Sequence, residues 1–167
     1  MITLAFYKGR GQTRWQRISD GAIRLATGGQ FSHVELIAGS ALHGDIVRCW
    51  SASGRDGGVR SRQIWLKPEN WDLVELRIDP NEPIKFIQER IGAKYDFVGI
   101  LLSHVLAIGG HRKGRWFCSE ICAAALGVSS PQRVSPQFLF EIVTWGGKPK
   151  CGEKCSHLVC SSGSVAS

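Results

Sequence analysis

The most informative segment of this 167-residue chain is Trp116-Phe117-Cys118-Ser119-Glu120-Ile121-Cys122-Ala123-Ala124-Ala125-Leu126-Gly127. Its apolar, alanine-rich run ends at a glycine, which predicts a short helix beginning beside Cys118. Backbone N–H groups and the helix dipole at such a start favour a thiolate over a thiol. Cys118 is therefore the candidate nucleophile. Cys122 lies one turn deeper in the helix and is expected to pack in the core, which is the usual role of a cysteine among alanines.

A second segment supplies a possible base for this thiol. Residues 31–37 read Phe31-Ser32-His33-Val34-Glu35-Leu36-Ile37 and alternate as a strand does. His33 offers the imidazole that a thiol nucleophile needs. Glu35 falls on the same face because side chains in a strand repeat every two residues, so its carboxylate could orient the imidazole. Alternatively, Glu35 points to solvent or pairs with an arginine. Rival orienting groups on or just past the neighbouring strand are Asp45, Ser51 and Asp56.

The remaining pattern predicts an α+β domain over residues 1–145, with an antiparallel sheet packed against helices. Strands are expected at 2–8, 31–38, 45–51, 58–66 and 71–78. Their connections are too short to hold crossover helices, so the sheet should be antiparallel. Helices are expected at 14–26, 84–91, 95–108, 117–126 and 137–143.

Residues 146–167 shift to glycine, lysine, cysteine and serine, which predicts a tail rather than core. Four potential zinc ligands lie in it: Cys151, Cys155, His157 and Cys160. Their spacing is compressed and lacks a Cys-x-x-Cys pair, so the preferred interpretation is a tail without metal, and no metal or other cofactor is expected. The six cysteines of the chain do not suggest a disulfide framework, and a reducing compartment suits them better.

The charge of the chain is strongly positive, with a formal net value of +7. This excess suits a solvated basic surface, or contact with an anionic partner such as a cell-wall polymer or a lipid surface. The positive residues are scattered, as Arg10, Arg24, Arg60 and Arg115 illustrate. They form no helix stripe interleaved with aromatic residues, so no specific nucleic-acid partner is expected. The oligomeric state is left open.

The hydropathy of the chain predicts no membrane span. The longest apolar run, residues 98–110, is shorter than the roughly 20 residues that a span requires, and it contains His104. Residues 1–8 predict an opening strand and lack the features of a signal peptide. A cytoplasmic location is expected on these grounds, with a viral particle as an alternative destination.

Three short motifs occur in a characteristic order: Ser32-His33-Val34, Gly92-Ala93-Lys94-Tyr95-Asp96-Phe97 and Phe117-Cys118-Ser119-Glu120. Together they resemble the circularly permuted NlpC-like papain-fold cysteine hydrolases. The YiiX-type branch is the most similar, and lecithin:retinol acyltransferases are relatives. The resemblance spans roughly residues 1–140. The stretch Gly54-Arg55-Asp56-Gly57-Gly58-Val59 also resembles uncharacterised proteins encoded by tailed bacteriophages.

This resemblance implies a permuted papain-like fold in which the histidine precedes the cysteine. It implies Cys118 as nucleophile, His33 as general base and Tyr95-Asp96 as a structural motif that positions the helix. A first-strand tyrosine often lies near the thiol in such enzymes, and Tyr7 is the candidate here. A cleavable amide bond in cell-wall peptide is the implied substrate. A lipid-directed thioesterase or acyltransferase, acting on an acyl substrate, and a catalytically silent binding or virion module are the alternatives.

The chain departs from the family pattern at the third polar residue. Family members commonly carry a glutamate on the strand after the histidine, where this chain has Trp50-Ser51-Ala52. Either Glu35 takes its place, or a serine or backbone carbonyl orients the imidazole, or the site is weakened. The expected substrate-binding side chains are Tyr7, Trp50 and Ser51.

Overall fold

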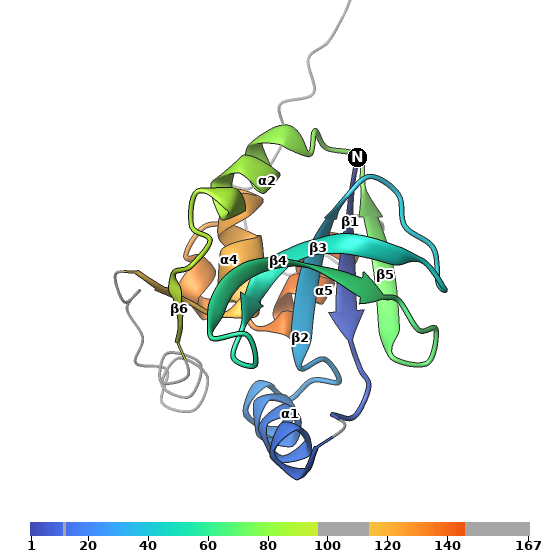
Figure 1. The fold of residues 1–167 in the computed structure, drawn as a ribbon, viewed down its shortest axis with the longest axis vertical. Helices are drawn as coiled ribbons and strands as arrows, with labels where there is room; N and C mark the ends of the chain where they lie inside the picture. Colours follow the sequence, from blue (N-terminus) through green and yellow to red (C-terminus); the bar gives the residue numbers. More distant parts are fainter. Residues whose placement is uncertain (12, 97–113, 146–167) are drawn as a thin grey trace, which may run out of the picture.

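The computed structural model describes residues 1–11, 13–96 and 114–145, in which a curled sheet carries helices against one face (Figure 1). The strands are β1 (Ile2–Tyr7), β2 (His33–Ala38), β3 (Ile46–Ser53), β4 (Gly58–Trp65), β5 (Trp71–Leu76), β6 (Lys94–Tyr95) and β7 (Arg115–Trp116). The helices are α1 (Arg14–Thr27), α2 (Asn81–Gln88), α4 (Cys118–Ala125) and α5 (Pro136–Thr144), with a 3₁₀ turn η1 (Pro131–Arg133). The predicted α+β class is confirmed.

The strands follow the order β5-β1-β2-β3-β4-β6-β7 across the sheet. Every neighbouring pair is antiparallel except β6 and β7, which run parallel. The antiparallel arrangement predicted from short connections is therefore confirmed for the first five strands of the chain. The predicted positions of those strands, and of the helices at 14–26, 84–91, 117–126 and 137–143, agree with the structure to within a few residues at each end.

One predicted helix begins in the wrong place. Residues 95–108 were expected to be helical, but Tyr95 belongs to β6 and pairs with Trp116. The Tyr95 N–H donates to the Gly57 carbonyl at 3.1 Å, so pairing with distant segments overrides the local apolar periodicity. Residues 97–108 of that prediction, which include His104, and the tail at 146–167 lie outside the described residues. Within the described ranges, no helix is long and apolar enough to cross a bilayer.

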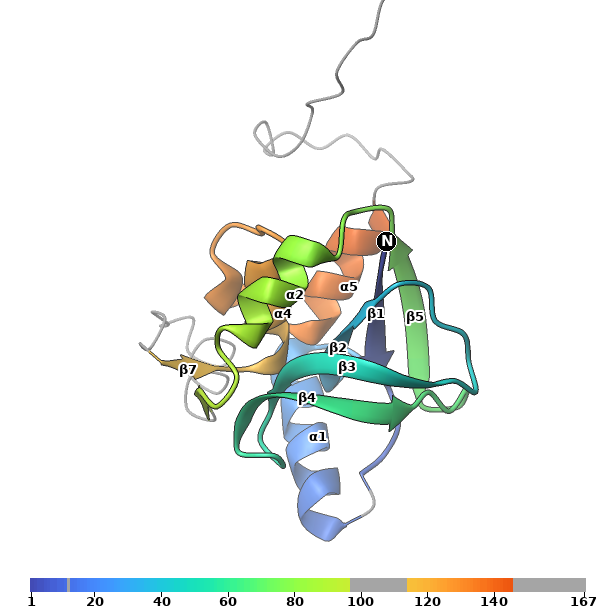
Figure 2. The same ribbon diagram turned by 45° about the horizontal axis from the view of Figure 1, so that its top comes forward.

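The main core lies between the sheet and the helices α2, α4 and α5, which Figure 2 shows on one side of the strands. Alternate residues of β1 face it: Ile2, Leu4 and Phe6 are fully buried there. The rings of Phe6, Phe31 and Phe140 pack together with centroids 4.7–5.4 Å apart. The opposite face of the sheet holds a smaller apolar cluster around Ala5, Ile37, Cys49, Leu66 and Trp71. Helix α4 thus sits deep in the domain, against β2 and β3.

Candidate active site

Strands β2 and β3 separate at the point where the candidate base lies. Their ladder holds Leu36 opposite Trp50 and Ile37 opposite Cys49. Closer to the start of β2, the Ser51 hydroxyl donates to the Val34 carbonyl at 2.7 Å, so a side chain bridges the two strands there. Helix α4 packs against both strands. The fold therefore brings the first turn of α4 to the diverging ends of β2 and β3.

Cys118 is the first residue of α4, as the sequence predicts. Phe117 before it is extended, with φ −110° and ψ 168°, and its N–H donates to the Glu120 carboxylate at 3.4 Å. This bond is one half of a capping box, and it fixes how the chain enters the helix. The Ser119 hydroxyl donates to the Val134 carbonyl at 2.6 Å and ties the first turn to the segment before α5. The thiol is therefore held in place by its neighbours on both sides.

The Cys118 sulfur has two polar partners from distant parts of the chain. One is the imidazole of His33, at the start of β2, and the other is the hydroxyl of Tyr95, in β6; the charge of Cys118 and hydrogen bonding to it raise the pKa of both groups. The predicted pair of Cys118 and His33 is thus brought together. The second contact was not expected, because the sequence assigned Tyr95 only a structural role.

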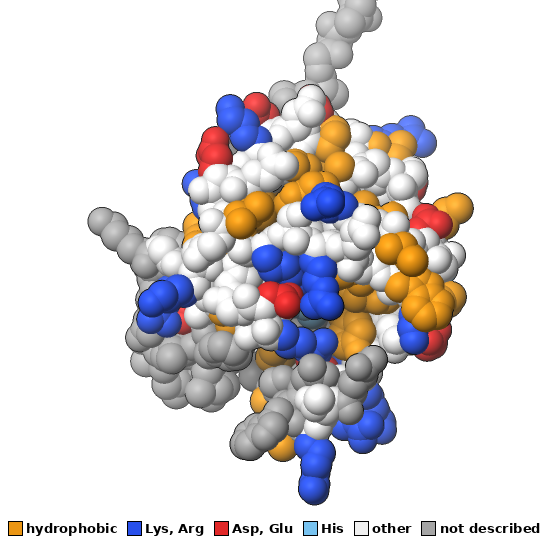
Figure 3. All heavy atoms as spheres, viewed as in Figure 1, with side chains coloured by type: hydrophobic (Ala, Val, Ile, Leu, Met, Phe, Trp, Pro, Cys, Tyr) orange, Lys and Arg blue, Asp and Glu red, His pale blue; other side chains and the backbone are white. Residues whose placement is uncertain are grey.

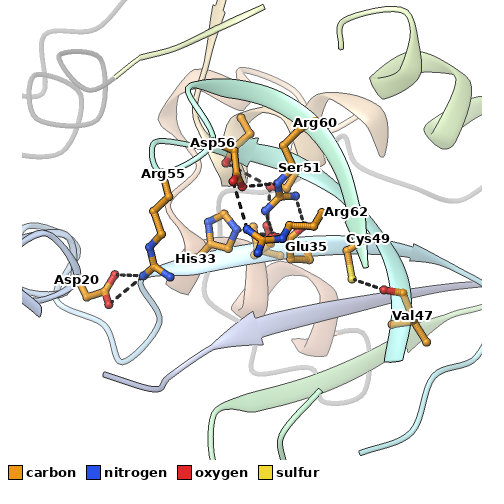
Figure 4. A network of polar contacts seen from close by, with 12 residues as sticks. Asp20, His33, Glu35, Val47, Cys49, Ser51, Arg55, Asp56, Arg60 and Arg62 are labelled. Carbon is orange, nitrogen blue, oxygen red and sulfur yellow. Dashed lines mark hydrogen bonds and ion pairs between the residues drawn. The ribbon is translucent and has the colours of Figure 1, made fainter. Parts of the chain in front are cut away.

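The imidazole of His33 also contacts a buried carboxylate (Figure 4). His33 Nε2 lies 2.7 Å from Glu35 Oε1, and the Glu35 side chain is fully buried. Arg60, on β4, binds this carboxylate in a bidentate manner: its Nη1 donates to Oε2 at 2.7 Å and its Nη2 donates to Oε1. The Arg60 Nε donates in turn to Asp56 at 2.9 Å. Glu35 therefore has both of the partners considered for it from the sequence, since it contacts the imidazole and also pairs with an arginine.

The charges in this network lower the pKa of Glu35 and raise the pKa of His33. Burial alone would raise the pKa of Glu35, but the charge and hydrogen bonds of Arg60, helped by His33, lower it from 4.5 to about 2. Burial alone would lower the pKa of His33, but the charges of Cys118 and Glu35 and hydrogen bonds to both raise it from 6.5 to about 9. At neutral pH, Glu35 is thus a carboxylate and His33 an imidazolium that faces the sulfur.

These shifts predict how stability depends on pH. Because the pKa of Glu35 is lowered in the fold, its carboxylate stabilises the protein above pH 4.5, and this stabilisation is lost as pH falls toward about 2. Because the pKa of His33 is raised, its imidazolium stabilises the protein below pH 6.5, and this stabilisation is lost as pH rises through about 9. Urea unfolding as a function of pH should therefore show the greatest contribution from this pair between about pH 4.5 and 6.5. Cys118→Ala should flatten the alkaline decline. An unchanged alkaline decline in that variant would contradict the assignment to His33.

The other thiols of the described region differ from Cys118 in their surroundings. Burial, the largest cause, raises the pKa of Cys122 well above its ordinary value, and the nearby Ser51 hydroxyl only partly offsets this rise. Burial also raises the pKa of Cys49, whose sulfur contacts the Val47 carbonyl at 3.6 Å. Burial raises the pKa of the Tyr95 phenol as well, so that hydroxyl stays protonated at neutral pH and can donate to Cys118. Of these three cysteines, Cys118 is the one in contact with an imidazole.

The residues expected to bind substrate are partly or fully buried. Tyr7 is opposite His33 in the β1–β2 ladder, but its hydroxyl donates to the Arg10 carbonyl at 3.2 Å and its ring packs on Trp71. The tyrosine bonded to the thiol is instead Tyr95. Trp50 is buried in the main core and Ser51 is fully buried between the strands. Helix α4 packs against β3, the strand that carries both residues.

Two rival orienting groups also have defined places. Asp56 reaches the site only through Arg60, and Arg62 donates to its other oxygen at 3.2 Å. Asp45 accepts from the Leu42 N–H at 2.8 Å and closes its own loop. Arg60 itself was not singled out from the sequence. A signal for it exists, since a glutamate within an apolar strand requires a cation when it is buried.

The sulfur is enclosed, and the imidazole is the more accessible member of the pair. Cys118 is 1% exposed, whereas the His33 side chain is 20% exposed. Arg55, at the β3–β4 turn, lies beside His33 and pairs with Asp20 of α1 at 3.4 Å (Figure 4). Arg60 and Arg62 both pair with Asp56 in this region. Figure 3 shows an acidic side chain surrounded by lysine or arginine side chains on this face of the domain.

No set of three histidine, cysteine, aspartate or glutamate side chains among the described residues is arranged to hold a metal ion. Comparison of the chain with models of known protein families and with curated proteins finds no match. The chemistry of the site therefore has to be argued from its own geometry.

Proposed function

We propose that the protein is a cysteine hydrolase that cleaves an amide bond, with Cys118 as nucleophile and His33 as general acid and base. The observation that carries this proposal is the His33 imidazole, which contacts the Glu35 carboxylate at 2.7 Å and whose pKa is raised by the neighbouring Cys118. A thiol at a helix start, an imidazole in contact with it and a carboxylate behind the imidazole are the parts that nucleophilic acyl transfer requires.

The cycle begins with attack of the Cys118 thiolate on the substrate carbonyl carbon. Backbone N–H groups at the start of α4 are suited to hold the oxyanion, and the Tyr95 hydroxyl is a further donor beside the sulfur. The C–N bond then breaks, and the His33 imidazolium gives its proton to the departing amine. Neutral His33 next removes a proton from water as the water oxygen attacks the acyl carbon. The C–S bond breaks, which releases a carboxylic acid and restores the thiolate.

Glu35 and Arg60 act behind this pair as positioning residues. The carboxylate contacts Nε2 and so leaves the other ring nitrogen for the sulfur. Arg60 keeps the carboxylate ionised and fixes both of its oxygens. A carboxylate held in this way stabilises the imidazolium that forms during acyl transfer. The absence of a glutamate at Trp50-Ser51-Ala52 is then no loss, because Glu35 fills that role from the strand that carries His33.

The permuted papain-like fold and the cell-wall substrate belong to the same proposal. That fold is supported by the order of the chain: His33 lies on a strand, Cys118 lies later on a helix, and antiparallel strands come between them in the sequence. The resemblance to NlpC-like hydrolases and to phage-encoded proteins favours an amide bond in cell-wall peptide. Because the Cys118 sulfur is enclosed, the substrate carbonyl must enter on the side of His33 and displace neighbouring atoms.

Labelling by iodoacetamide tests the choice of nucleophile. Cys118→Ala should abolish the fast phase of labelling at neutral pH, because this thiol has an imidazole beside it that can accept its proton. Cys122→Ala is the matched control, since it removes a thiol one turn away on the same helix and should leave the fast phase intact. Equal labelling of the two variants would contradict the assignment.

Purified peptidoglycan and a lipid ester then distinguish the substrate classes. Release of new amine groups from peptidoglycan by the parent protein, and not by Cys118→Ala, supports the proposed activity. Cleavage of the lipid ester alone would favour a thioesterase or acyltransferase with the same residues. A parent protein that labels no faster than Cys118→Ala and cleaves neither substrate would be a silent binding module.

A further inference from the structure

Helix α1 presents an apolar face to solvent. Ile18, Ala22 and Leu25 are spaced i, i+4 and i+7, so they share one side of the helix. All three are exposed, and the exposed fractions of Ile18 and Leu25 are 61% and 87%. The same kind of spacing normally marks the side of a helix that packs on a core. Here α1 projects from the domain, apart from the three helices that cover the sheet (Figure 2).

The side of α1 attached to the domain carries Ile23, which packs against the main core, and two polar residues with partners in the domain. Asp20 is 6% exposed and pairs with Arg55. Arg24 donates to the Gly9 carbonyl and, at 3.4 Å, to the Ser32 hydroxyl. These polar contacts fix the rotation of the helix about its axis. They therefore hold Ile18, Ala22 and Leu25 outward.

The charges beside this apolar face are all positive. Arg14 and Arg17 are exposed on α1, and Arg10 is exposed in the segment that leads to it. The only acidic residue of the helix is Asp20, which is turned inward and already neutralised by Arg55. A helix with an exposed apolar face and a rim of arginines is complementary to a surface that is itself apolar within and anionic outside.

We propose that α1 docks this protein on an anionic lipid membrane. Ile18, Ala22 and Leu25 enter the boundary between headgroups and acyl chains, and the arginines contact headgroup phosphates. The helix lies in the plane of the surface, as amphipathic interfacial helices do. A second copy of the chain fits this face less well, because pairing α1 with itself would bring two sets of arginines together in a protein whose net charge is +7.

Docking in this way would orient the candidate active site. The inward side of α1 carries Asp20, whose partner Arg55 lies beside His33 (Figure 4). The helix therefore stands between the bound surface and the residues around the site. The proposal does not depend on the hydrolase activity, since none of the docking side chains takes part in the proposed chemistry.

Co-sedimentation with vesicles tests the proposal. The full chain should bind vesicles of phosphatidylcholine and phosphatidylglycerol, and bind vesicles of phosphatidylcholine alone more weakly. The double substitution Ile18→Ser and Leu25→Ser leaves the net charge unchanged and should lower partitioning into the anionic vesicles at least about tenfold. The matched control is Ile78→Ser with Ile91→Ser, which removes two aliphatic side chains that are exposed elsewhere. It should bind as the parent does.

Equal binding by the two double variants would overturn the proposal, because attraction would then come from net charge alone. The parent protein could instead self-associate in solution, and the double variant Ile18→Ser with Leu25→Ser could be monomeric. That result would identify the face as a contact between copies and would also overturn the proposal. Circular dichroism should show both double variants folded, since the substituted side chains are exposed. Cys118→Ala should bind vesicles normally, so failure of the proposed hydrolysis remains distinguishable from failure of docking.

Discussion

Glu35→Gln is expected to lower the free energy of unfolding by about 3–5 kcal/mol. The substitution keeps the size of the side chain but removes the charge that compensates Arg60 and His33. Arg60 is only 14% exposed, so it cannot recover the lost interaction by turning to water. Breaking one partner of a buried ion pair is costly for this reason, whatever the net contribution of the intact pair. Urea unfolding at a pH near 6 is the appropriate measurement.

A double-mutant cycle identifies the pair responsible. Arg60→Met should also destabilise the protein. The double variant should lose much less free energy of unfolding than the sum of the two single losses, because the second substitution removes a charge that the first has left unpaired. Asp72→Asn is the matched control. It removes a carboxylate from the Lys8–Asp72 pair, whose side chains are 34% and 31% exposed, and should cost less than about 1 kcal/mol. Additive losses in the cycle would contradict a coupled Glu35–Arg60 pair.

His33→Gln is expected to reduce the rate of iodoacetamide labelling at neutral pH, and any hydrolysis of peptidoglycan, by roughly 10²–10⁴-fold. Glutamine can still form a hydrogen bond, but it can neither carry a positive charge nor transfer a proton. The loss should therefore appear in the chemical step. The fold should survive, because the His33 side chain is partly exposed at the start of β2.

His43→Gln provides the control for this substitution. His43 is exposed, and its Nε2 contacts the Trp71 carbonyl at 3.0 Å, on the smaller apolar cluster and not at the thiol. Its replacement should leave the labelling rate unchanged. A His43 variant as slow as the His33 variant would mean that both act through general destabilisation.

Local patterns predict most of the parts of this site. Cys118 is identifiable because an apolar run that ends at glycine marks the helix and its first residue. His33 and Glu35 are identifiable as neighbours on one face because strand side chains alternate. These inferences need only residues close together in the chain. They are therefore accessible without knowledge of the tertiary structure.

The partners that come from distant strands are not accessible in this way. Arg60 reaches Glu35 because β4 pairs with β3 in a register that sets it opposite Ser51. Tyr95 reaches Cys118 because β6 extends the sheet beyond β4, although its surroundings in sequence suggest a helix. The outward apolar face of α1 is also a tertiary result, since it depends on where Asp20 and Arg24 find partners. Each of these features depends on register or docking that periodicity does not contain.

The central claim is that Cys118 and His33 interact closely enough to share a proton. Nuclear magnetic resonance titration of the His33 ring tests it most directly. The pKa of His33 should lie well above 6.5, toward about 9, and should fall in Cys118→Ala because the charge of Cys118 is the largest cause that raises it. Cys122→Ala should leave that titration in place. A His33 pKa at or below its ordinary value, unchanged by Cys118→Ala, would contradict the account.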